Sequence, residues 1–404
     1  MNWPLTSQQS AFYPTWMMHQ NDVQEVREQV RRVLTKSLVP KIESSENTGV
    51  FCREVHKELG ALGLAAPILP EAFGGADNPY YQLAVAEEMG YFNNGFGLSS
   101  LVSTCLFGGN VARHGTEIQK KKYLPDIVSG ETMGCWALTE PMVGSDAVSV
   151  QSKAYRDGDT YTLNGVKTFI TNAPISDVFL VIAREVNRTG EPLAQGIEGG
   201  TAFLLERNMP GLRTGLPFKK MGHRSSPTGE IFLENVKVHE SQVLGKPGKA
   251  FYDMKHSLDV ERVVFSGLAT GMMQFCVDRT LKYTLERTQF GQPIANFQMI
   301  QDKLAQMVVL LETAREYLYL INDRMAKGEK INLEAAITKL VVAENTKRVT
   351  DMAVQCHGGY GYMAEYEVER CLRDAKLFEI GAGTSEILKL IIAKQAYKNF
   401  QTKK

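Results

Sequence analysis

The stretch "KLFEIGAGTSEILKL", residues 376–390, decides how this sequence is interpreted. Gly381-Ala382-Gly383 interrupts a run of helix-forming residues, and Thr384-Ser385-Glu386 follows with the pattern that caps the start of a new helix. Glycines between two helices let another group approach the backbone closely. The sequence therefore predicts a binding site at this break, and it raises the question whether Glu379 or Glu386 takes part in its chemistry.

The composition is typical of a globular protein with several domains. A chain of 404 residues with 44% hydrophobic residues is expected to form two or three cores, at roughly 150 residues per domain. Lysine plus arginine and aspartate plus glutamate number 45 each, and the longest basic run is Lys120–Lys122, which argues against nucleic acid as a partner. No apolar run approaches the ~20 residues of a membrane span, and the N-terminus has no targeting pattern. We therefore expect a cytoplasmic protein with no membrane partner.

The cysteines favour the same compartment. They are widely spaced, without a Cys-x-x-Cys pair or a neighbouring pair of histidines, so we expect reduced, mostly buried thiols and no structural metal. The six cysteines are Cys52, Cys105, Cys135, Cys276, Cys356 and Cys371.

Hydrophobic periodicity divides the chain into a helical segment, a β segment and a second helical segment. Residues 21–134 carry helical stripes, as in "VQEVREQVRRVLTKSLVPKI". Residues 135–245 contain short β-rich runs such as "DVFLVIAR", and "LNGV" at 163–166 predicts a hairpin turn. Long helical patterns return over 246–404. Residues 1–20 show no period, and we expect them to form an arm on the surface.

Several polar and glycine-rich clusters remain after the common catalytic signatures are excluded. The sequence contains no dinucleotide fingerprint, phosphate-binding loop, Gly-x-Ser-x-Gly elbow or His-Glu-x-x-His. Taken singly, each cluster has an ordinary structural interpretation. "VGSD" (143–146) is typical of a polar turn, and "HGGYG" (357–361) is typical of a helix end. "DVER" (259–262) is typical of a solvated charged face. His357 lacks a second ligand at helical spacing, which favours a packed residue over a metal ligand.

In their order along the chain, these clusters resemble the acyl-CoA dehydrogenase family, with motifs spread over roughly nine-tenths of the sequence. This family consists of flavoenzymes. The resemblance implies a mainly α fold with a central β domain: a helical N-terminal domain (21–134), a β-barrel (135–245) and a C-terminal four-helix bundle (246–404). The motifs that carry it are "HGTEIQKKKYLPDIVSGE" (114–131), "ALTEPMVGSD" (137–146), "LNGVKTFITNA" (163–173), "MGHRSSPTGEIFLENVKV" (221–238), "ERTQFGQPIANFQ" (286–298) and "QCHGGYGYMAEYEVERCLRDAKLFEIGAGTSEI" (355–387).

The resemblance also implies the chemistry, the α,β-desaturation of an acyl thioester. A carboxylate removes the α-proton, the β-hydrogen leaves as hydride to N5 of FAD, and preorganised donors polarise the thioester carbonyl. In many members the base is a glutamate directly before Gly-Thr, but this chain has Ala382 there. A second arrangement, seen in isovaleryl-CoA dehydrogenase, holds the glutamate before an arginine on the first long C-terminal helix. This chain has Glu261-Arg262 at that place, so we predict Glu261 as the base, with Glu379 and Glu386 as secondary candidates.

Further site residues follow from the same resemblance. The implied cofactor-binding residues are Trp136, Leu138, Thr139, Gly144, Ser145, Phe169, Ile170, Thr171, Arg287, Phe290, Gln298, Gln355, Gly358, Gly359, Thr384, Ser385 and Glu386. The implied substrate-binding residues are Ser145, Tyr252, Asp259, Arg262, Gly381, Ala382 and Gly383. Part of the FAD site would come from a neighbouring subunit, so a homo-oligomer is expected, usually a tetramer. An electron-transferring flavoprotein is the expected electron acceptor.

The acyl group is only partly defined. The small Gly381 and Ala382 leave width near the α and β carbons, which suits a short or branched acyl-CoA. Departures from the family pattern include Met142-Val143, and Trp136 and Phe378 stand where tyrosine is frequent. One alternative is an acyl or aminoacyl thioester, such as a prolyl group, on a carrier protein, and oxygen could replace the flavoprotein acceptor. A third possibility, of another class, is a protein that binds acyl-CoA or flavin without turnover.

Overall fold

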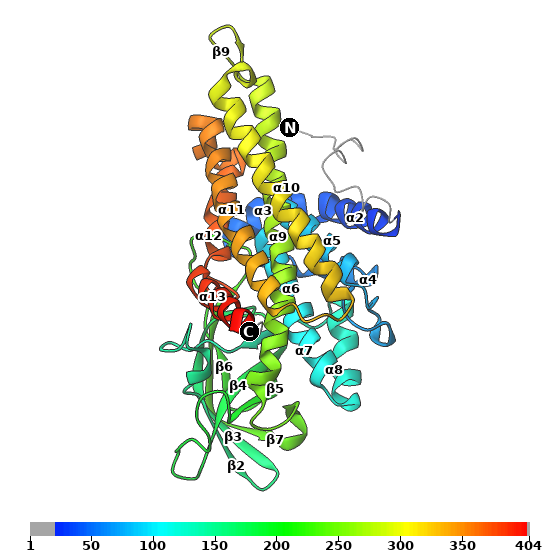
Figure 1. The fold of residues 1–404 in the computed structure, drawn as a ribbon. Helices are drawn as coiled ribbons and strands as arrows, with labels where there is room; N and C mark the ends of the chain where they lie inside the picture. Colours follow the sequence, from blue (N-terminus) through cyan, green and yellow to red (C-terminus); the bar gives the residue numbers. More distant parts are fainter. Residues whose placement is uncertain (1–20, 402–404) are drawn as a thin grey trace.

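The computed structural model describes residues 21–401 (Figure 1). A group of short helices, a β sheet and a set of long helices follow one another along the chain, in the order predicted from the periodicity. The arm predicted for residues 1–20 lies outside the described residues. No helix within 21–401 is long and apolar enough to cross a membrane.

The N-terminal part is helical because its apolar residues recur with helical spacing. In its first helix Val23, Val26, Val30 and Val33 are buried, which confirms the predicted stripe. Its last helix starts with a capping box, in which Thr116 and Gln119 each bond to the other's backbone. The elements are α2 (Asn21–Val33), η2 (Leu34–Leu38), η3 (Val39–Lys41), α3 (Ile42–Thr48), α4 (Arg53–Ala61), η4 (Glu71–Phe73), α5 (Pro79–Phe92), α6 (Asn94–Leu101), η5 (Val102–Gly108), α7 (Gly109–His114) and α8 (Glu117–Ser129).

The middle part is a single sheet of mostly antiparallel strands. Its strands pair in the order β6-β7-β3-β2-β4-β5-β8, and β1 pairs in parallel with β4 outside this path. The strands are β1 (Gly134–Ala137), β2 (Lys153–Asp157), β3 (Thr160–Thr171), β4 (Val178–Val186), β5 (Gly200–Glu206), β6 (Leu212–Thr214), β7 (Thr228–His239) and β8 (Val243–Leu244). Short helical turns flank them at η6 (Ala147–Ser149) and η7 (Glu240–Gln242).

The hairpin turn predicted at residues 163–166 is wrong. These residues lie inside β3, where the register with β7 shifts between Leu163 and Gly165. Gly165 is instead needed for close packing, because a Cβ at this position would come 2.3 Å from Oγ of Ser152. The β2–β3 turn falls at Gly158, which has a φ of 61°.

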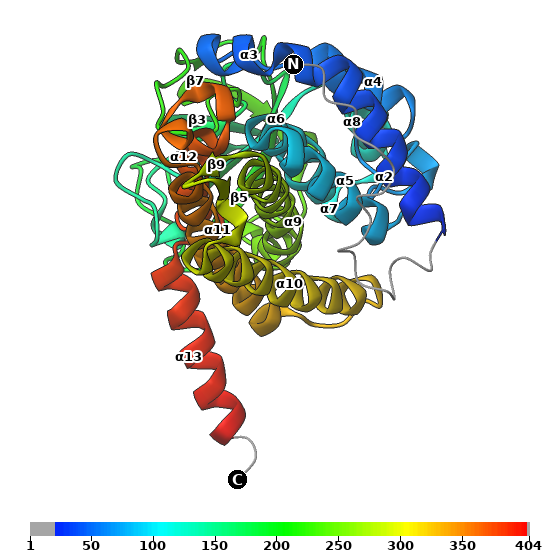
Figure 2. The ribbon, with the colours of Figure 1, turned by 90° about the horizontal axis from the view of Figure 1, so that it is seen from above.

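The C-terminal part consists of long helices that pack side by side. The elements are α9 (Ala250–Glu286), β9 (Thr288–Gln289), β10 (Gln292–Pro293), η8 (Ile294–Asn296), α10 (Gln298–Ala326), α11 (Asn332–His357), η9 (Gly358–Tyr362), η10 (Ala364–Tyr366), α12 (Val368–Phe378) and α13 (Ser385–Gln401). Helix α9 contacts α10, α11 and α12, whereas α13 contacts α11. Figure 2 shows α13 extending away from the other helices.

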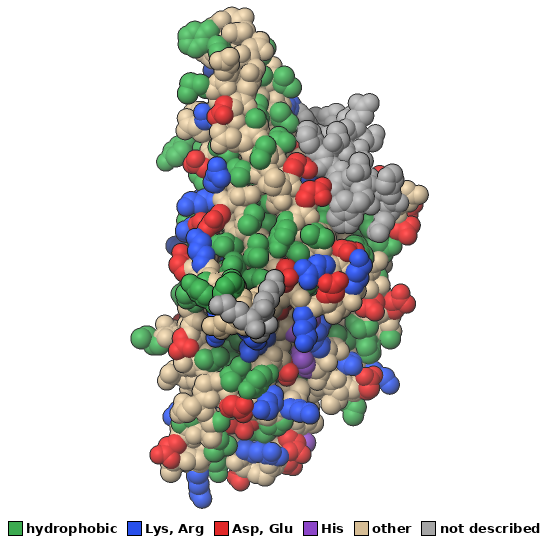
Figure 3. Space-filling model, viewed as in Figure 1, with side chains coloured by type: hydrophobic (Ala, Val, Ile, Leu, Met, Phe, Trp, Pro, Cys, Tyr) green, Lys and Arg blue, Asp and Glu red, His purple; other side chains and the backbone are tan. Residues whose placement is uncertain are grey.

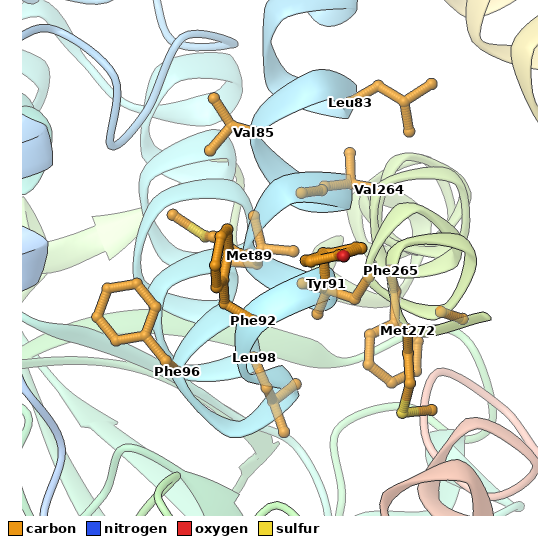
Figure 4. Close-up of a cluster of buried hydrophobic side chains, with 14 of the residues drawn as sticks. Leu83, Val85, Met89, Tyr91, Phe92, Phe96, Leu98, Val264, Phe265 and Met272 are labelled. Atoms are coloured by element: carbon orange, nitrogen blue, oxygen red, sulfur yellow. The ribbon is translucent and has the colours of Figure 1, made fainter. Parts of the chain in front are cut away.

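Helices α5 and α9 join the N-terminal and C-terminal parts in one core (Figure 4). Their backbones touch because both helices carry glycines at the crossing. A Cβ on Gly90 would come 2.0 Å from the carbonyl oxygen of Leu268, and one on Gly271 would come 2.0 Å from that of Glu87. The close packing fixes α9, which carries the predicted base, against the N-terminal helices.

Candidate active site

A cavity of about 1720 Å³ lies where the N-terminal helices, the sheet and the C-terminal helices meet. Its walls come from α6 and η5, from the loops that follow β1 and end β3, from the first half of α9, and from the break between α12 and α13. Predicted residues that line it are Trp136, Leu138, Thr139, Gly144, Ser145, Phe169, Ile170, Thr171, Tyr252, Asp259, Glu261, Arg262, Gly381, Ala382, Gly383 and Thr384.

The wall after β1 is fixed by a buried ion pair behind it. Nζ of Lys167 lies 2.7 Å from Oε1 of Glu140 and donates to the carbonyl oxygen of Leu138 at 3.0 Å. Burial alone would raise the pKa of Glu140, but the charge of Lys167 and its hydrogen bonds hold that pKa below the usual value. The backbone N–H of Thr168 donates to the carbonyl oxygen of Thr139 at 3.0 Å. Leu138 and Thr139 are thus held in a defined position at the cavity.

The end of β3 is reshaped by a bulge. The register with β7 shifts between Lys167 and Ile170, and Phe169 has a left-handed φ of 57°. The bulge turns the side chain of Phe169 out of the sheet and into the cavity wall. Phe169 is 69% exposed. Its ring centroid lies 5.8 Å from that of Phe218.

One face of α9 forms the opposite wall. Its residues there recur at three- and four-residue spacing, from Tyr252 to Arg262. The hydroxyl of Tyr252 donates to Glu198 at 2.8 Å. Nη1 of Arg262 lies 3.1 Å from Oδ1 of Asp259, and this pair is buried. The solvated-face interpretation of "DVER" is therefore wrong for these two residues, because the break between α12 and α13 and the α10–α11 loop cover them.

Glu261 presents an unsatisfied carboxylate to the cavity. Its Oε2 atom is buried and has no hydrogen-bond partner within the described residues. Burial raises the pKa of Glu261 to about 7, although the charges of Arg262 and Lys339 lower it. A carboxylate in this environment changes its protonation near neutral pH, as a general base requires.

The break between α12 and α13 is held by two cations. Nε of Arg262 donates to the carbonyl oxygen of Ala382 at 3.3 Å, and Nζ of Lys339 donates to that of Gly383 at 2.7 Å. Ala382 has a φ of 53° and Gly383 a φ of 93°. The left-handed backbone at Ala382 stores strain that these bonds offset.

The other two acidic candidates lie elsewhere. Oε2 of Glu379 is 2.7 Å from Nζ of Lys376 and does not line the cavity. Glu386 is exposed in the first turn of α13. Ser385 is buried, and its hydroxyl has no partner within the described residues.

The sequence reasoning missed an apolar slot beside Glu261. Leu98, Val102 and Leu106 line the cavity from α6 and η5, and Leu258 and Phe265 line it from α9. The first three have the i, i+4, i+8 spacing of one helical face. This signal was present in the sequence, but nearly every residue of α6 and η5 is buried, so periodicity could not separate the cavity face from the core face.

A second set of predicted cofactor residues lies at the far end of the long helices, beside the β9–β10 hairpin at the top of Figure 1. Phe290 in this hairpin is 93% exposed, and the guanidinium of Arg287 lies 5.4 Å from the ring centroid of Tyr360. This set does not line the cavity of its own chain. Its members are Arg287, Phe290, Gln298, Gln355, Gly358 and Gly359.

The cavity is large enough to hold more than one small ligand. Its volume exceeds the roughly 300–1,000 Å³ of a site for one small ligand. Its lining includes the aromatic residues Trp136 and Phe169, which suit a flat ring system, and the hydroxyl-bearing residues Thr139 and Thr171. Within residues 21–401, no group of three or more His, Cys, Asp or Glu side chains is arranged to hold a metal ion.

Three family models match nearly the whole chain. They describe the N-terminal, middle and C-terminal domains of acyl-CoA dehydrogenase and match residues 20–131, 135–236 and 248–397.

Named relatives extend over the same length. The chain is 41% identical to a probable acyl-CoA dehydrogenase, YngJ, of Bacillus subtilis (strain 168), covering 93% of this chain and 98% of that protein. It is 37% identical to mitochondrial isovaleryl-CoA dehydrogenase of Solanum tuberosum, covering 96% and 94%. Among solved structures, the prolyl acyl carrier protein oxidase AnaB superposes with a TM-score of 0.88 at 31% identity, covering 93% of this chain and 99% of that one.

Proposed function

The chain belongs to the acyl-CoA dehydrogenase family, and from this premise we propose that it uses FAD to desaturate a short or branched acyl-CoA, with Glu261 as the α-proton base. Members of this family are oxidoreductases that act on CH–CH bonds, and this chain is such an enzyme. The observation that carries the proposal is the buried, unpartnered Oε2 atom of Glu261 at the cavity wall. Ala382, at the usual position of the base, has no carboxylate.

The residues of this chain would act as follows. Glu261 removes the α-proton, and its desolvated carboxylate is basic enough to do so near neutral pH. The apolar side chains of Leu98, Val102 and Phe265 exclude water from the acyl chain. FAD, when bound beside these residues, would supply the acceptor for the hydride that leaves the β-carbon. Arg262 and Lys339 hold the backbone of the 381–383 loop beside the reacting carbons.

The flavin would be held by two sets of residues. The wall that includes Trp136, Thr139 and Phe169 suits the flavin ring. The set at the far end of the long helices, with Arg287 and Gln355, would serve the FAD of a neighbouring subunit. This division supports a homo-oligomer, which we propose to be a tetramer.

The slot beside Glu261 supports a short acyl group. Phe265 follows Glu261 by one turn, about 6 Å along the helix, and its ring lies 4.5 Å from that of Phe378. Phe265, backed by Phe378, would limit the length of an acyl group that extends beyond the base. The lack of side-chain bulk at Gly381 and Ala382 leaves room for a branch.

The visible spectrum tests the proposal. We expect the purified protein to show a flavin band that isovaleryl-CoA bleaches under anaerobic conditions. Glu261→Gln should keep the band, but the rate of bleaching should fall by about 10²–10⁴-fold, the usual contribution of a general base. Glu25→Gln, at an exposed position on α2, is the control and should bleach like the wild type. Near-normal bleaching in Glu261→Gln would refute the assignment of the base.

A carrier-protein thioester is the second candidate. The similarity to AnaB favours it. Lys255, Lys330 and Lys394 are exposed at the cavity and are compatible with both candidates. In the view of Figure 3, basic side chains lie near the middle of the molecule, with histidine beside them. Positive charge there suits either the phosphates of CoA or an acidic carrier protein. Comparison of kcat/KM for the same acyl group on CoA and on a carrier protein separates the two.

Two observations would change the remaining assignments. We propose an electron-transferring flavoprotein as the acceptor, and peroxide release without an added acceptor would instead indicate an oxidase. A purified protein that binds acyl-CoA but bleaches with neither kind of thioester would point to a binding protein without turnover.

A further inference from the structure

We propose that Lys339 is a positioning residue of this site, holding the 381–383 loop in place and keeping Glu261 in the ionised form that accepts the proton. The proposal rests on the proposed role of Glu261. Lys339 lies on α11, behind the loop, and is only 2% exposed. It does not line the cavity, so it acts through its neighbours and not by contact with substrate.

The loop is bound at two successive carbonyl groups by cations from two different helices. Lys339 of α11 donates to Gly383 at 2.7 Å, and Arg262 of α9 donates to Ala382 at 3.3 Å. The described chain has no cis peptide bond. Because a trans peptide directs its N–H opposite to its C=O, the two bonds also fix the direction of the N–H groups of Gly383 and Thr384.

A buried ammonium needs more than a carbonyl oxygen to stay charged. Desolvation of an ammonium costs several kcal/mol unless an opposite charge is near. Burial lowers the pKa of Lys339 to about 8, and the negative charge of Glu261 is the main influence that raises it. Glu379 and Glu386 add smaller contributions of the same sign. Lys339 therefore remains charged at neutral pH, and Glu261 is the largest single source of compensating charge.

Lys339 is also the cation near Glu261 that is least committed elsewhere. Arg262 pairs with the carboxylate of Asp259 at 3.1 Å. Lys339 forms no direct ion pair with any residue of the described chain. From η5, the remaining titratable neighbour is Cys105, and burial raises the pKa of this thiol to about 12, so it carries no charge at neutral pH. Lys339 is therefore the second cation, after Arg262, whose charge lowers the pKa of Glu261, and within the described residues it has no carboxylate partner of its own.

Charge and hydrogen bonding can be separated with two variants. Lys339→Gln keeps a donor for Gly383 but removes the charge, and Lys339→Arg keeps the charge. In a plot of kcat/KM against pH, the rise on the acid side should shift to higher pH by about one unit in Lys339→Gln. In Lys339→Arg it should return toward the wild-type position. Lys347→Gln is the matched control, since Lys347 lies on the same helix but is exposed and faces Glu379 at 3.8 Å.

A spectroscopic measurement without turnover gives an independent test. The protonated carboxyl group of Glu261 gives an infrared band, which is identified by its absence in Glu261→Gln. This band should disappear at a higher pH in Lys339→Gln than in the wild type. An unmoved rise on the acid side and an unmoved band in Lys339→Gln would overturn the proposal, because a purely structural lysine changes stability but not the titration of Glu261. A turnover in Glu261→Gln close to that of the wild type would instead refute the proposed function itself.

Discussion

The carboxylate of Glu261 should set the pH dependence of the reaction. Burial raises its pKa to about 7, so the ionised base is scarce at pH 6 and dominant at pH 8. We expect kcat/KM to rise about tenfold per pH unit below pH 7 and to level off above it. Rate measurements between pH 5 and pH 9 check this expectation. A kcat/KM that is already level at pH 5, as for a glutamate with the ordinary pKa near 4.3, would contradict it.

The same carboxylate should make the folded protein less stable as the pH rises. The folded-state pKa of about 7 lies above the unfolded value of about 4.3, so the folded state binds more protons between these values. The free energy of unfolding therefore falls as the pH rises through this window. Glu261→Gln removes the effect, and its stability relative to the wild type should increase by on the order of 2 kcal/mol from pH 5 to pH 8. Chemical denaturation at both pH values measures this difference. An equal difference at both pH values would show that Glu261 ionises freely in the folded state.

At the scale of single elements, the loop after β1 depends on the buried pair of Lys167 and Glu140. Lys167→Met leaves the carboxylate of Glu140 buried without its cation. Loss of one partner of a buried pair typically costs about 3–5 kcal/mol, and the loop should also lose its hold on the flavin. Denaturation and flavin titration measure the two effects. Lys237→Met should change neither, because Lys237 is exposed on β7 and its hydrogen bond within residues 21–401 goes to Thr162.

The α9 wall should determine the length of the acyl chain. Phe265→Ala removes the ring that would limit the length of the acyl group, and we expect the preferred substrate to become longer by two or more carbons. A panel of straight-chain acyl-CoA esters measures this preference through kcat/KM. Phe275→Ala is the control, because Phe275 is buried on the same helix against Tyr91 and does not line the cavity. It should lose about 3–5 kcal/mol of stability with the preference unchanged.

The sequence predicted these elements with uneven success, for physical reasons. The stripe of α2 was recovered because one of its faces packs and the other meets water. The Asn-Gly signal in β3 failed because the glycine serves a close approach to Ser152, which only the folded sheet reveals. The apolar slot was missed because α6 is buried on all sides. The partners of Arg262 and Lys339 depend on contacts between α9, α11 and the 381–383 loop, and no local pattern encodes such contacts.

At the scale of the whole molecule, the predicted flavin residues fall into two groups that one chain cannot bring together. Trp136 and Phe169 belong to the cavity, while Arg287 and Phe290 lie at the opposite end of the long helices (Figure 1). The exposed ring of Phe290 and the protruding helix α13 (Figure 2) provide surface that a second copy could cover. A complete site would then combine the cavity of one subunit with the far end of another.

This arrangement predicts complementation between two inactive variants. Glu261→Gln damages the cavity, and Arg287→Ala damages the far end, so each homo-oligomer should have low activity. In a mixed oligomer, an Arg287→Ala subunit keeps an intact cavity and can receive the intact far end of a Glu261→Gln subunit. We expect up to about a quarter of wild-type activity to return when the two variants are unfolded together and refolded at equal amounts, because random pairing builds an intact site with that frequency. If each subunit instead held its FAD alone, the mixture would be no more active than the mean of the two separate variants, and the proposed shared site would be wrong.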